Sequence, residues 1–555
     1  MKPRTAILDR RRAAARLGLL IGILLGGALL LAPFARADGS GDGGAATPQP
    51  AKPAAESPSP AAAQLYQNNC ASCHGDTRLG NTGPALLPQS LSRLRGEKLT
   101  QVITAGRPLT QMPGYAARLS AAQISELTAF LRQPPAVIPI WRQTEITASR
   151  SFNRDYRPAE APVFSGDPLN ITLVVETGDH HVTVLDGDVM EPIARFPTRY
   201  AVHGGPKFTP DGRYVFIMSR DGWVMKYDIW SLQPVAEVRA GVNSRNIAIS
   251  SDGKNLAVAN YLPTSLVILS TDDFSVEKIF DVTDKAGTPS RVSAVYQAPS
   301  RKSFIAALKD VSEIWEIATS PEGDPVYEGF VHNYEKGRIE AIASSQGLFA
   351  LRRIATSRPL DDFFFTPDYR NLVGASRADD AGVVVNLNVG REIAELPLGG
   401  MPHLGSGISW VRNGRRVMAT PHLRGAKLSV IDIEDWKVIA SIKTDGPGFF
   451  LRSHENSPYA WTDVFVGPQK DVMHVIDKQS LKIVKTLRPA PGKTVAHVEF
   501  DRYGRYALVS VWEDEGEIIV YDAQSLEEIK RLPMRKPSGK YNIWNKIKFS
   551  EGTSH

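Results

Sequence analysis

The chain has 555 residues, with 65 lysines and arginines, 59 aspartates and glutamates, and two cysteines. This length exceeds what a single hydrophobic core supports, so we expect two or three folded units. Residues 1–37 hold seven basic residues and one acid, which leaves 58 basic and 58 acidic residues in the remainder. A neutral remainder lacks the positive field that attracts nucleic acids and anionic lipids, and we expect neither as a partner.

The first 37 residues have the pattern of a secretory signal peptide. Six basic residues precede an apolar run at 17–31, and Ala35-Arg36-Ala37 offers small residues for cleavage. The run is shorter than the roughly 20 residues of a membrane span, which favours removal over a retained anchor. We therefore expect a periplasmic protein with no stable membrane insertion. Residues 38–63, rich in Gly, Ala, Pro and Ser, predict a disordered linker.

Both cysteines lie in one motif, Cys70-Ala71-Ser72-Cys73-His74. The pattern C-x-x-C-H is the attachment sequence of c-type haem. The two thiols bind the haem covalently, and the adjacent His74 places an imidazole on the iron. We expect one covalent c haem per chain, although two cysteines in an exported protein are also compatible with a disulfide.

The residues that follow support the haem interpretation. Thr82-Gly83-Pro84 offers a carbonyl oxygen to the ring N–H of His74, a bond that fixes the imidazole. Met112, followed by Pro113-Gly114-Tyr115, supplies a thioether for the other axial position, or alternatively fills the core. Ser120 predicts the start of a helix with Ile124, Leu127, Phe130 and Leu131 on one face. Residues 64–133 therefore resemble a class I cytochrome c, which is a small all-α domain.

After a connector at 134–162, residues 163–555 show the pattern of an all-β domain built from one repeated phrase. An alternating apolar strand ends in a polar residue, as in Val182-Thr183-Val184-Leu185-Asp186, and a turn and a short apolar strand follow. The copies end at residues 186, 228, 270, 318, 388, 432, 477 and 522. Spacings in the forties are typical of propeller blades, so eight copies predict an eight-bladed propeller. The gap of 70 residues between 318 and 388 predicts an insertion near 328–352.

The most specific stretch of this second domain is Arg199-Tyr200-Ala201-Val202-His203, followed by motifs at 210–214, 219–221 and 228–230. Fused to a cytochrome c, it resembles the cytochrome cd1 nitrite reductase family, most closely the branch of dihydro-haem d1 dehydrogenases that complete haem d1 biosynthesis. The resemblance implies non-covalently bound haem d1 or its dihydro precursor, with His203 as the proximal iron ligand. It also implies that polar side chains hold the carboxylates of the macrocycle, namely Arg220, Arg245, Arg291 and Tyr261.

The distal side departs from the nitrite reductases of that family, which use two histidines to protonate nitrite. Residues 401–407 retain His403, whereas the other histidine's best counterpart is Asp361, and the sequence has no histidine between His332 and His403. Loss of one of two proton donors argues against nitrite reduction. The resemblance to the dehydrogenases instead implies His403 as the distal iron ligand, with His497 and Tyr541 beside the propionate that is oxidised.

The expected reaction is oxidation of one propionate of dihydro-haem d1 to an acrylate. Electrons pass through the iron to the c haem and on to an external periplasmic acceptor, while Tyr541 removes or relays a proton or hydrogen atom and His497 assists as a base. Nitrite reductase or other haem d1 biosynthesis proteins are further expected partners. The alternatives are a variant nitrite reductase, a non-catalytic haem d1 carrier, and an electron-transfer cytochrome in which His203 and His403 are incidental.

Overall fold

The computed structural model describes residues 59–555, apart from 82, 92–93, 95, 108–111, 136–139, 200, 323–325, 328–343, 377–380, 550 and 552–555. The predicted signal peptide, nearly all of the predicted linker, and most of the predicted insertion lie outside the described residues. The flanks of the insertion form a two-stranded sheet of β16 (Val326–Tyr327) and β17 (Ser344–Ser345). No helix in the described part of the chain is long and apolar enough to cross a membrane.

A helical region comes first and contains the cysteine motif. Its helices are α1 (Pro60–Asn69), α2 (Ala71–His74), α3 (Lys98–Ala105) and α4 (Ala121–Arg132). The predicted start of α4 is confirmed, because Ser120 and Gln123 form a reciprocal capping box that satisfies two backbone N–H groups. Ile124, Leu127 and Leu131 bury one face of α4 against Tyr66 of α1, in a core of the region's own.

The remaining chain forms the predicted propeller, with eight sheets of four or five strands among the described residues. In chain order the first four blades are β35 (Pro537–Asn542), β2 (Ile171–Glu176), β3 (His181–Asp186), β4 (Glu191–Pro197); β5 (Lys207–Phe208), β6 (Tyr214–Met218), β7 (Trp223–Asp228), β8 (Gln233–Arg239); β9 (Asn243–Ile249), β10 (Asn255–Leu262), β11 (Ser265–Ser270), β12 (Val276–Asp281); and β13 (Val292–Ala298), β14 (Ser303–Leu308), β15 (Glu313–Ala318), β18 (Leu351–Ala355).

The last four blades have the same order, with each strand paired to the one before it. They are β19 (Asp362–Phe365), β20 (Asn371–Ala375), β21 (Gly382–Asn386), β22 (Arg391–Leu396); β23 (Ile408–Arg412), β24 (Arg415–Pro421), β25 (Lys427–Asp432), β26 (Lys437–Lys443); β27 (Leu451–Ser453), β28 (Tyr459–Asp463), β29 (Met473–Asp477), β30 (Ile483–Leu487); and β31 (Val495–Phe500), β32 (Tyr506–Val511), β33 (Gly516–Asp522), β34 (Glu528–Met534).

The repeated sequence phrase corresponds to one place in each blade, the end of the third strand. Seven of the eight predicted positions are the last residue of such a strand, and β21 ends at Asn386, two residues before the predicted 388. The recurring aspartate has a local cause, because its carboxylate accepts N–H groups of the turn that follows. Asp228 accepts from Trp230 at 2.9 Å, and Asp522 accepts from Gln524 at 3.0 Å. Aspartate thereby fixes the tight turn into the outermost strand.

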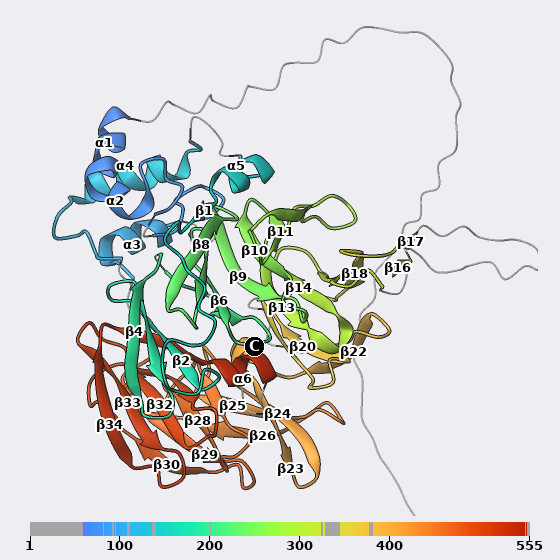
Figure 1. The fold of residues 1–555 in the computed structure, drawn as a ribbon. Helices are drawn as coiled ribbons and strands as arrows, with labels where there is room; N and C mark the ends of the chain where they lie inside the picture. Colours follow the sequence, from blue (N-terminus) through green and yellow to red (C-terminus); the bar gives the residue numbers. More distant parts are fainter. Residues whose placement is uncertain are drawn as a thin grey trace, which may run out of the picture. The chain divides into compact units, whose positions relative to one another are not determined.

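The two ends of the propeller sequence meet in the first blade. Strand β35 is antiparallel to β2, with Leu173 opposite Tyr541, so the innermost strand of the first blade comes from the C-terminus. In Figure 1 the colours run from teal β2 to red β33 and β34. Helix α6 (Ile543–Lys548) follows β35, and Asn542 caps it by accepting the N–H of Asn545. The sequence pattern did not predict this helix.

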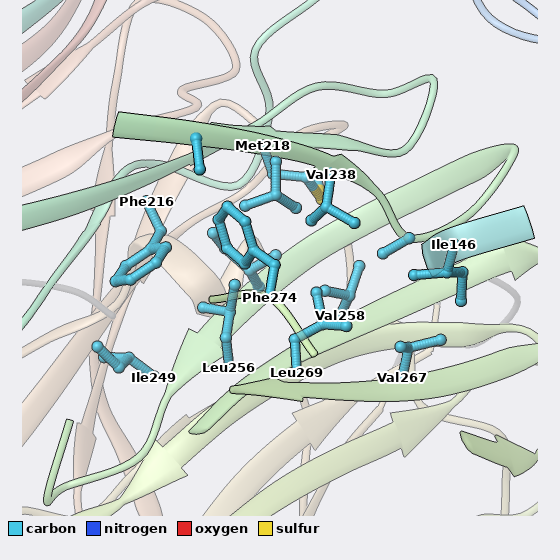
Figure 2. Close-up of a cluster of buried hydrophobic side chains, with 14 residues drawn as sticks. Ile146, Phe216, Met218, Val238, Ile249, Leu256, Val258, Val267, Leu269 and Phe274 are labelled. Carbon is cyan, nitrogen blue, oxygen red and sulfur yellow. The ribbon is translucent and has the colours of Figure 1, made fainter. Parts of the chain in front are cut away.

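Hydrophobic side chains fill the spaces between neighbouring blades. Figure 2 shows one such cluster, where Phe216 and Met218 of the second blade meet Leu256 and Val258 of the third. Ile146 of α5 (Gln143–Ala148) is fully buried in the same cluster. The segment predicted as a connector is therefore anchored to the propeller, and it also adds β1 (Ser151–Phe152) to the outer edge of the second blade.

Candidate active site

The cysteine motif lies at the start of α2, with Cys70 at its N-cap and His74 at its end. His74 is 7% exposed, and its Nδ1 donates to the carbonyl oxygen of Pro84 at 2.8 Å. Burial lowers the pKa of His74, so the ring is neutral and Nε2 keeps a lone pair for a metal. A Cβ on Gly83 would lie 2.5 Å from Cε1 of His74, so only glycine allows this close approach.

The second predicted axial ligand lies in the same region. Met112 is partly buried against the hydrophobic cluster that contains Cys70, and both cysteines are free thiols. Two free thiols, a neutral imidazole with an orienting carbonyl, and a thioether make up the donor set of a covalently attached His/Met haem. The residues present therefore fit a c haem.

His203 and His403 come from equivalent loops of two blades. Each precedes an innermost strand, β5 in the second blade and β23 in the sixth, so the two loops lie opposite each other in a ring of eight. Two residues before each histidine lies a non-glycine residue with positive φ. These residues are Ala201, at 49°, and Met401, at 59°. Backbone strain of this kind is found at functional sites, where the surrounding structure holds it.

His203 has the hydrogen bonds of a neutral imidazole. Its Nδ1 donates to the carbonyl oxygen of Arg245 at 2.6 Å, and its Nε2 accepts from the guanidinium of Arg245 at 2.6 Å. Burial is the main reason that its pKa lies well below the ordinary value, and Arg220, Arg245 and His403 lower it further. Nε2 is the atom of His203 that would hold an iron ion, and here it accepts a hydrogen bond from Arg245.

His403 is oriented in a similar way. Its Nδ1 donates to the carbonyl oxygen of Phe449 at 2.7 Å, and its Nε2 lies 4.0 Å from a carboxylate oxygen of Asp362. The cavity beside it has a volume of about 20 Å³ and is also lined by Arg245 and Met401. Arg245 thus lies between the two histidines, where a guanidinium can meet a carboxylate of a bound tetrapyrrole.

His497 and Tyr541 lie side by side on the innermost strands of the eighth and first blades. Their ring centroids are 5.7 Å apart, and His497 is 1% exposed with a positive φ of 53°. Neither ring nitrogen of His497 has a hydrogen-bond partner among the described residues. Buried polar groups are rarely left without partners, so these orphaned nitrogens indicate a missing polar ligand.

The charges around this pair set its protonation states. Burial, with Lys540 and Arg452 beside it, lowers the pKa of His497 well below the ordinary value, so its ring is neutral. Burial raises the pKa of Tyr541 to about 12, so its hydroxyl stays protonated at neutral pH. Lys540 also donates to the carbonyl oxygen of His497 at 2.8 Å, which fixes the backbone at that position.

Arg291 and Tyr261 form a separate contact. The guanidinium of Arg291 is paired with Asp310 through two nitrogens, one at 2.8 Å from Oδ2, and lies 5.3 Å from the ring centroid of Tyr261. Its charge is thereby already balanced by a carboxylate. Lys309 connects this pair to the histidine site, because it lies 5.9 Å from the Tyr261 ring centroid and forms an ion pair with Asp361.

The structure also reveals buried charged residues that no motif indicated. Arg452 and Lys540 are enclosed within the propeller, and Asp463 accepts the backbone N–H groups of Phe449, Phe450 and His497. The only sequence signal for Arg452 is a charge that interrupts an apolar innermost strand. That signal becomes visible once the blades are aligned.

Comparisons with known proteins agree with this arrangement. A family model described as Cytochrome D1 heme domain matches residues 166–328 and 325–546, and one described as Cytochrome C oxidase, cbb3-type, subunit III matches residues 59–131. The chain thus has a c-type cytochrome domain and a D1 heme domain. It is 53% identical over 492 residues, 88% of this chain and 95% of the relative, to Dihydro-heme d1 dehydrogenase of Pseudomonas aeruginosa.

Two further known proteins are similar to most of the chain. A solved structure described as Dihydro-heme d1 dehydrogenase NirN in complex with DHE has a TM-score of 0.76 and 52% identity, covering 88% of this chain and 100% of that chain. Nitrite reductase of Stutzerimonas stutzeri is 24% identical over 544 residues, 87% of this chain and 92% of the relative. The chain is therefore a cytochrome fused to a haem-binding propeller. It belongs to the dihydro-heme d1 dehydrogenase family.

Proposed function

We propose that this chain is a periplasmic oxidoreductase that converts one propionate of dihydro-haem d1 to an acrylate and so yields haem d1. Its family membership supports the reaction. The observation that carries the residue assignment is the pair of His497 and Tyr541. The orphaned nitrogens of His497 lie beside a protonated phenol, on strands of the propeller that also positions His203 and His403.

The reaction removes two hydrogens from a saturated side chain. A –CH2–CH2–COO⁻ group becomes –CH=CH–COO⁻, and two protons and two electrons leave. The c haem, when bound through Cys70, Cys73, His74 and Met112, supplies an acceptor for one electron at a time. Two successive electron transfers to an external periplasmic acceptor therefore complete each turnover.

The residues of the chain have distinct tasks in binding. His203 and His403 would hold the iron through Nε2, because Nδ1 of each ring is bonded to a backbone carbonyl oxygen. Arg220 and Arg245 provide the cations that carboxylates of the substrate need, since a guanidinium binds a carboxylate through two parallel hydrogen bonds. Arg291 contacts both Tyr261 and Asp310, and Lys309 lies beside Tyr261. These residues therefore hold one another in place and shape one wall of the substrate site.

The residues beside the reacting side chain handle protons. A neutral His497 has an open lone pair for a proton and holds that proton only transiently, because its pKa lies well below the ordinary value. A phenol with a pKa of about 12 accepts a proton only as it releases its own. We therefore assign the base to His497 and the relay to Tyr541, whose hydroxyl passes on a proton or hydrogen atom. Lys540 and Asp463 hold the backbone of His497 and thus act as positioning residues.

Two features disfavour the alternatives. Asp361, the counterpart of the first distal histidine, is paired with Lys309, so it is a charge-balanced carboxylate and not a proton donor for nitrite. A carrier without chemistry needs no electron acceptor, yet this chain has a complete donor set for a c haem. Delivery of the finished haem d1 to nitrite reductase or to another biosynthesis protein is compatible with the dehydrogenase activity.

A mass measurement tests the proposal. The c-haem form of the full chain is incubated anaerobically with dihydro-haem d1 and an oxidised one-electron acceptor, and the extracted tetrapyrrole is analysed by mass spectrometry. We expect the loss of two hydrogens with two electrons delivered per product. An unchanged mass, combined with nitric oxide formation from nitrite in a separate anaerobic assay with a reduced electron donor, would identify a nitrite reductase. An unchanged mass with tight binding and no nitric oxide would identify a carrier.

A further inference from the structure

A cavity of about 680 Å³ lies at the other end of the innermost strands. Its wall includes Ile249 and Phe365, the last residues of β9 and β19, whereas the histidine site uses Arg245 and Asp362 from the beginnings of the same strands. We call this space the basal cavity. It is further lined by Lys207 of β5 and Lys546 of α6.

The two lysines are partly buried and face aromatic rings. The ammonium of Lys207 lies 5.9 Å from the ring centroid of Tyr296, and that of Lys546 lies 5.6 Å from the ring centroid of Tyr541. Lys207 makes no side-chain hydrogen bond or ion pair within the described ranges. Partial burial of an ammonium without a counter-ion is unfavourable, because it removes some of the water that stabilised the charge.

Among the described residues, positive charge exceeds negative charge around these lysines. Arg452 adds a positive charge that acts on both of them, and Glu499 is a carboxylate that acts on Lys546. Glu499 is shared, since it also acts on Arg452 and Lys540, and one of its oxygens accepts from Asn545 at 3.2 Å. At the rim, Arg416 is already paired with Glu551 at 2.8 Å.

The lysine pKa values report this excess. Burial and Arg452 lower the pKa of Lys207 to about 8, and burial, Arg452 and Lys207 lower that of Lys546 to about 7. Each lysine thus lies near the boundary between its charged and neutral forms at neutral pH. An anion between them would favour the charged forms of both.

We propose that the basal cavity binds a small dianion, with two negative charges on oxygen, between the ammonium groups of Lys207 and Lys546. A lysine ammonium is a compact point charge that suits phosphate and carboxylate oxygens. Apolar and aromatic walls strengthen such a pair because they exclude water. The wall residues of that kind are Phe208, Phe364, Phe365 and Phe549. The site differs from that of His203 and His403, because it uses the opposite ends of the strands, and it adjoins the proton-handling pair, because Lys546 faces Tyr541.

Calorimetry of the full c-haem chain tests this site without any tetrapyrrole. Inorganic phosphate and succinate are titrated separately at pH 7, and at least one should bind saturably with one site per chain. Phosphate alone would identify a phosphate group, and succinate alone a dicarboxylate. Lys207→Met and Lys546→Met should each weaken binding at least tenfold, while Lys548→Met, at the exposed rim, should change it less than about twofold. Unchanged far-ultraviolet circular dichroism confirms that each variant is folded.

The pH dependence adds a second readout. Because the anion prefers the protonated lysines, its affinity should fall as the pH rises through about 7 to 8. The charged and titratable groups around the cavity are Lys207, Tyr296, Asp368, Tyr369, Arg416, Arg452, Glu499, Tyr541, Lys546, Lys548 and Glu551. The proposal fails if neither anion binds, if Lys207→Met binds normally, or if binding appears only in a chain that ends at Glu551. The last result would show that residues 552–555 prevent the anion from binding in the full chain.

Discussion

At the scale of single residues, protonation decides how His497 and Tyr541 divide the work. Burial lowers the pKa of His497, and Lys540, Arg452 and Lys546 lower it further, so its imidazole is neutral. The phenol of Tyr541 keeps its proton because burial penalises a phenolate. The imidazole therefore offers an open lone pair to a proton, and the phenol accepts a proton only as it passes its own one on.

Replacing the phenol isolates its chemical role. Tyr541→Phe removes one oxygen and keeps the ring that packs against His497, so the affinity for dihydro-haem d1 should stay within about twofold. Turnover should fall at least about a hundredfold, the usual contribution of a proton-transferring group. Binding is followed by the absorption spectrum of the loaded protein and turnover by mass analysis of the tetrapyrrole.

The matched control is Tyr503→Phe, which removes the hydroxyl of an exposed tyrosine that donates to Asp167 at 3.2 Å. It should retain wild-type turnover. Wild-type activity in Tyr541→Phe would remove the phenol from the mechanism and leave His497 as the proton-handling group.

Asp463 predicts a pH dependence of stability. Burial raises its pKa from the ordinary 3.8 to about 6, so the folded state binds its proton more tightly than the unfolded chain does. Its contribution to stability is therefore full below about pH 4 and is lost as the pH rises through about 6. A shift of two units corresponds to about 3 kcal/mol.

This dependence should disappear in Asp463→Asn. The free energy of unfolding of the wild type, minus that of the variant, should fall by about 3 kcal/mol between pH 4 and pH 7 in denaturant titrations. Asp155→Asn, at an exposed position, should follow the wild type at both pH values. A constant difference for Asp463→Asn would show that this carboxyl does not titrate in that range.

The site residues differ in how well the sequence indicates them. His203 and His403 lie within motifs, and the structure places them in equivalent loops across the ring. Arg291 also lies in a motif, but its ion pair with Asp310 could not be predicted. Asp310 is 19 positions away, and no sequence pattern marks it. Lys207, Arg452 and Glu499 carry no motif, since only the closed ring brings them together. Their roles, like those of the motif residues, remain predictions for the experiments above.

At the scale of elements, the strands could be predicted because their turns repeat a local cause. The aspartate that ends a third strand accepts the N–H groups of the next turn. Because this aspartate recurs in most blades, the period of the blades can be detected in the sequence. Helices α5 and α6 were not predicted, because each has only six residues and too little length for a helical period. What stabilises α5 is the burial of Ile146 between blades, which is a tertiary contact.

The cap of α4 gives a test at this scale. The hydroxyl of Ser120 accepts the N–H of Gln123 at 3.3 Å, and the Gln123 side chain accepts the N–H of Ser120 at 2.9 Å. Ser120→Ala leaves a helix N–H without this partner and should lower the free energy of unfolding of the cytochrome region by about 1 kcal/mol. Denaturant unfolding followed by c-haem absorbance measures it. Ser120→Thr should lose less, and equal stability in all three proteins would contradict the role of the cap.

At the scale of the whole molecule, the active site depends on the closure of the ring. Tyr541 is on the last strand of the chain, yet that strand pairs with β2, so the sheet joins residues more than 350 positions apart. The same strand places Tyr541 next to His497 of the eighth blade. Strand β35 also covers the edge of β2 and so completes the first blade.

A chain that ends at Met534 tests this dependence, because it lacks β35 and α6. The truncation exposes the edge of β2 and removes Tyr541, Ile543 and Ile547 from the cluster between the first two blades. We expect loss of the cooperative thermal transition of the propeller and a tendency to aggregate, seen by circular dichroism and light scattering. The c-haem spectrum should persist, because the cytochrome region has its own hydrophobic cluster. Removal of residues 552–555 alone should leave the transition unchanged. An unaltered transition in the chain ending at Met534 would mean that seven complete blades and an incomplete first blade close without the C-terminal strand.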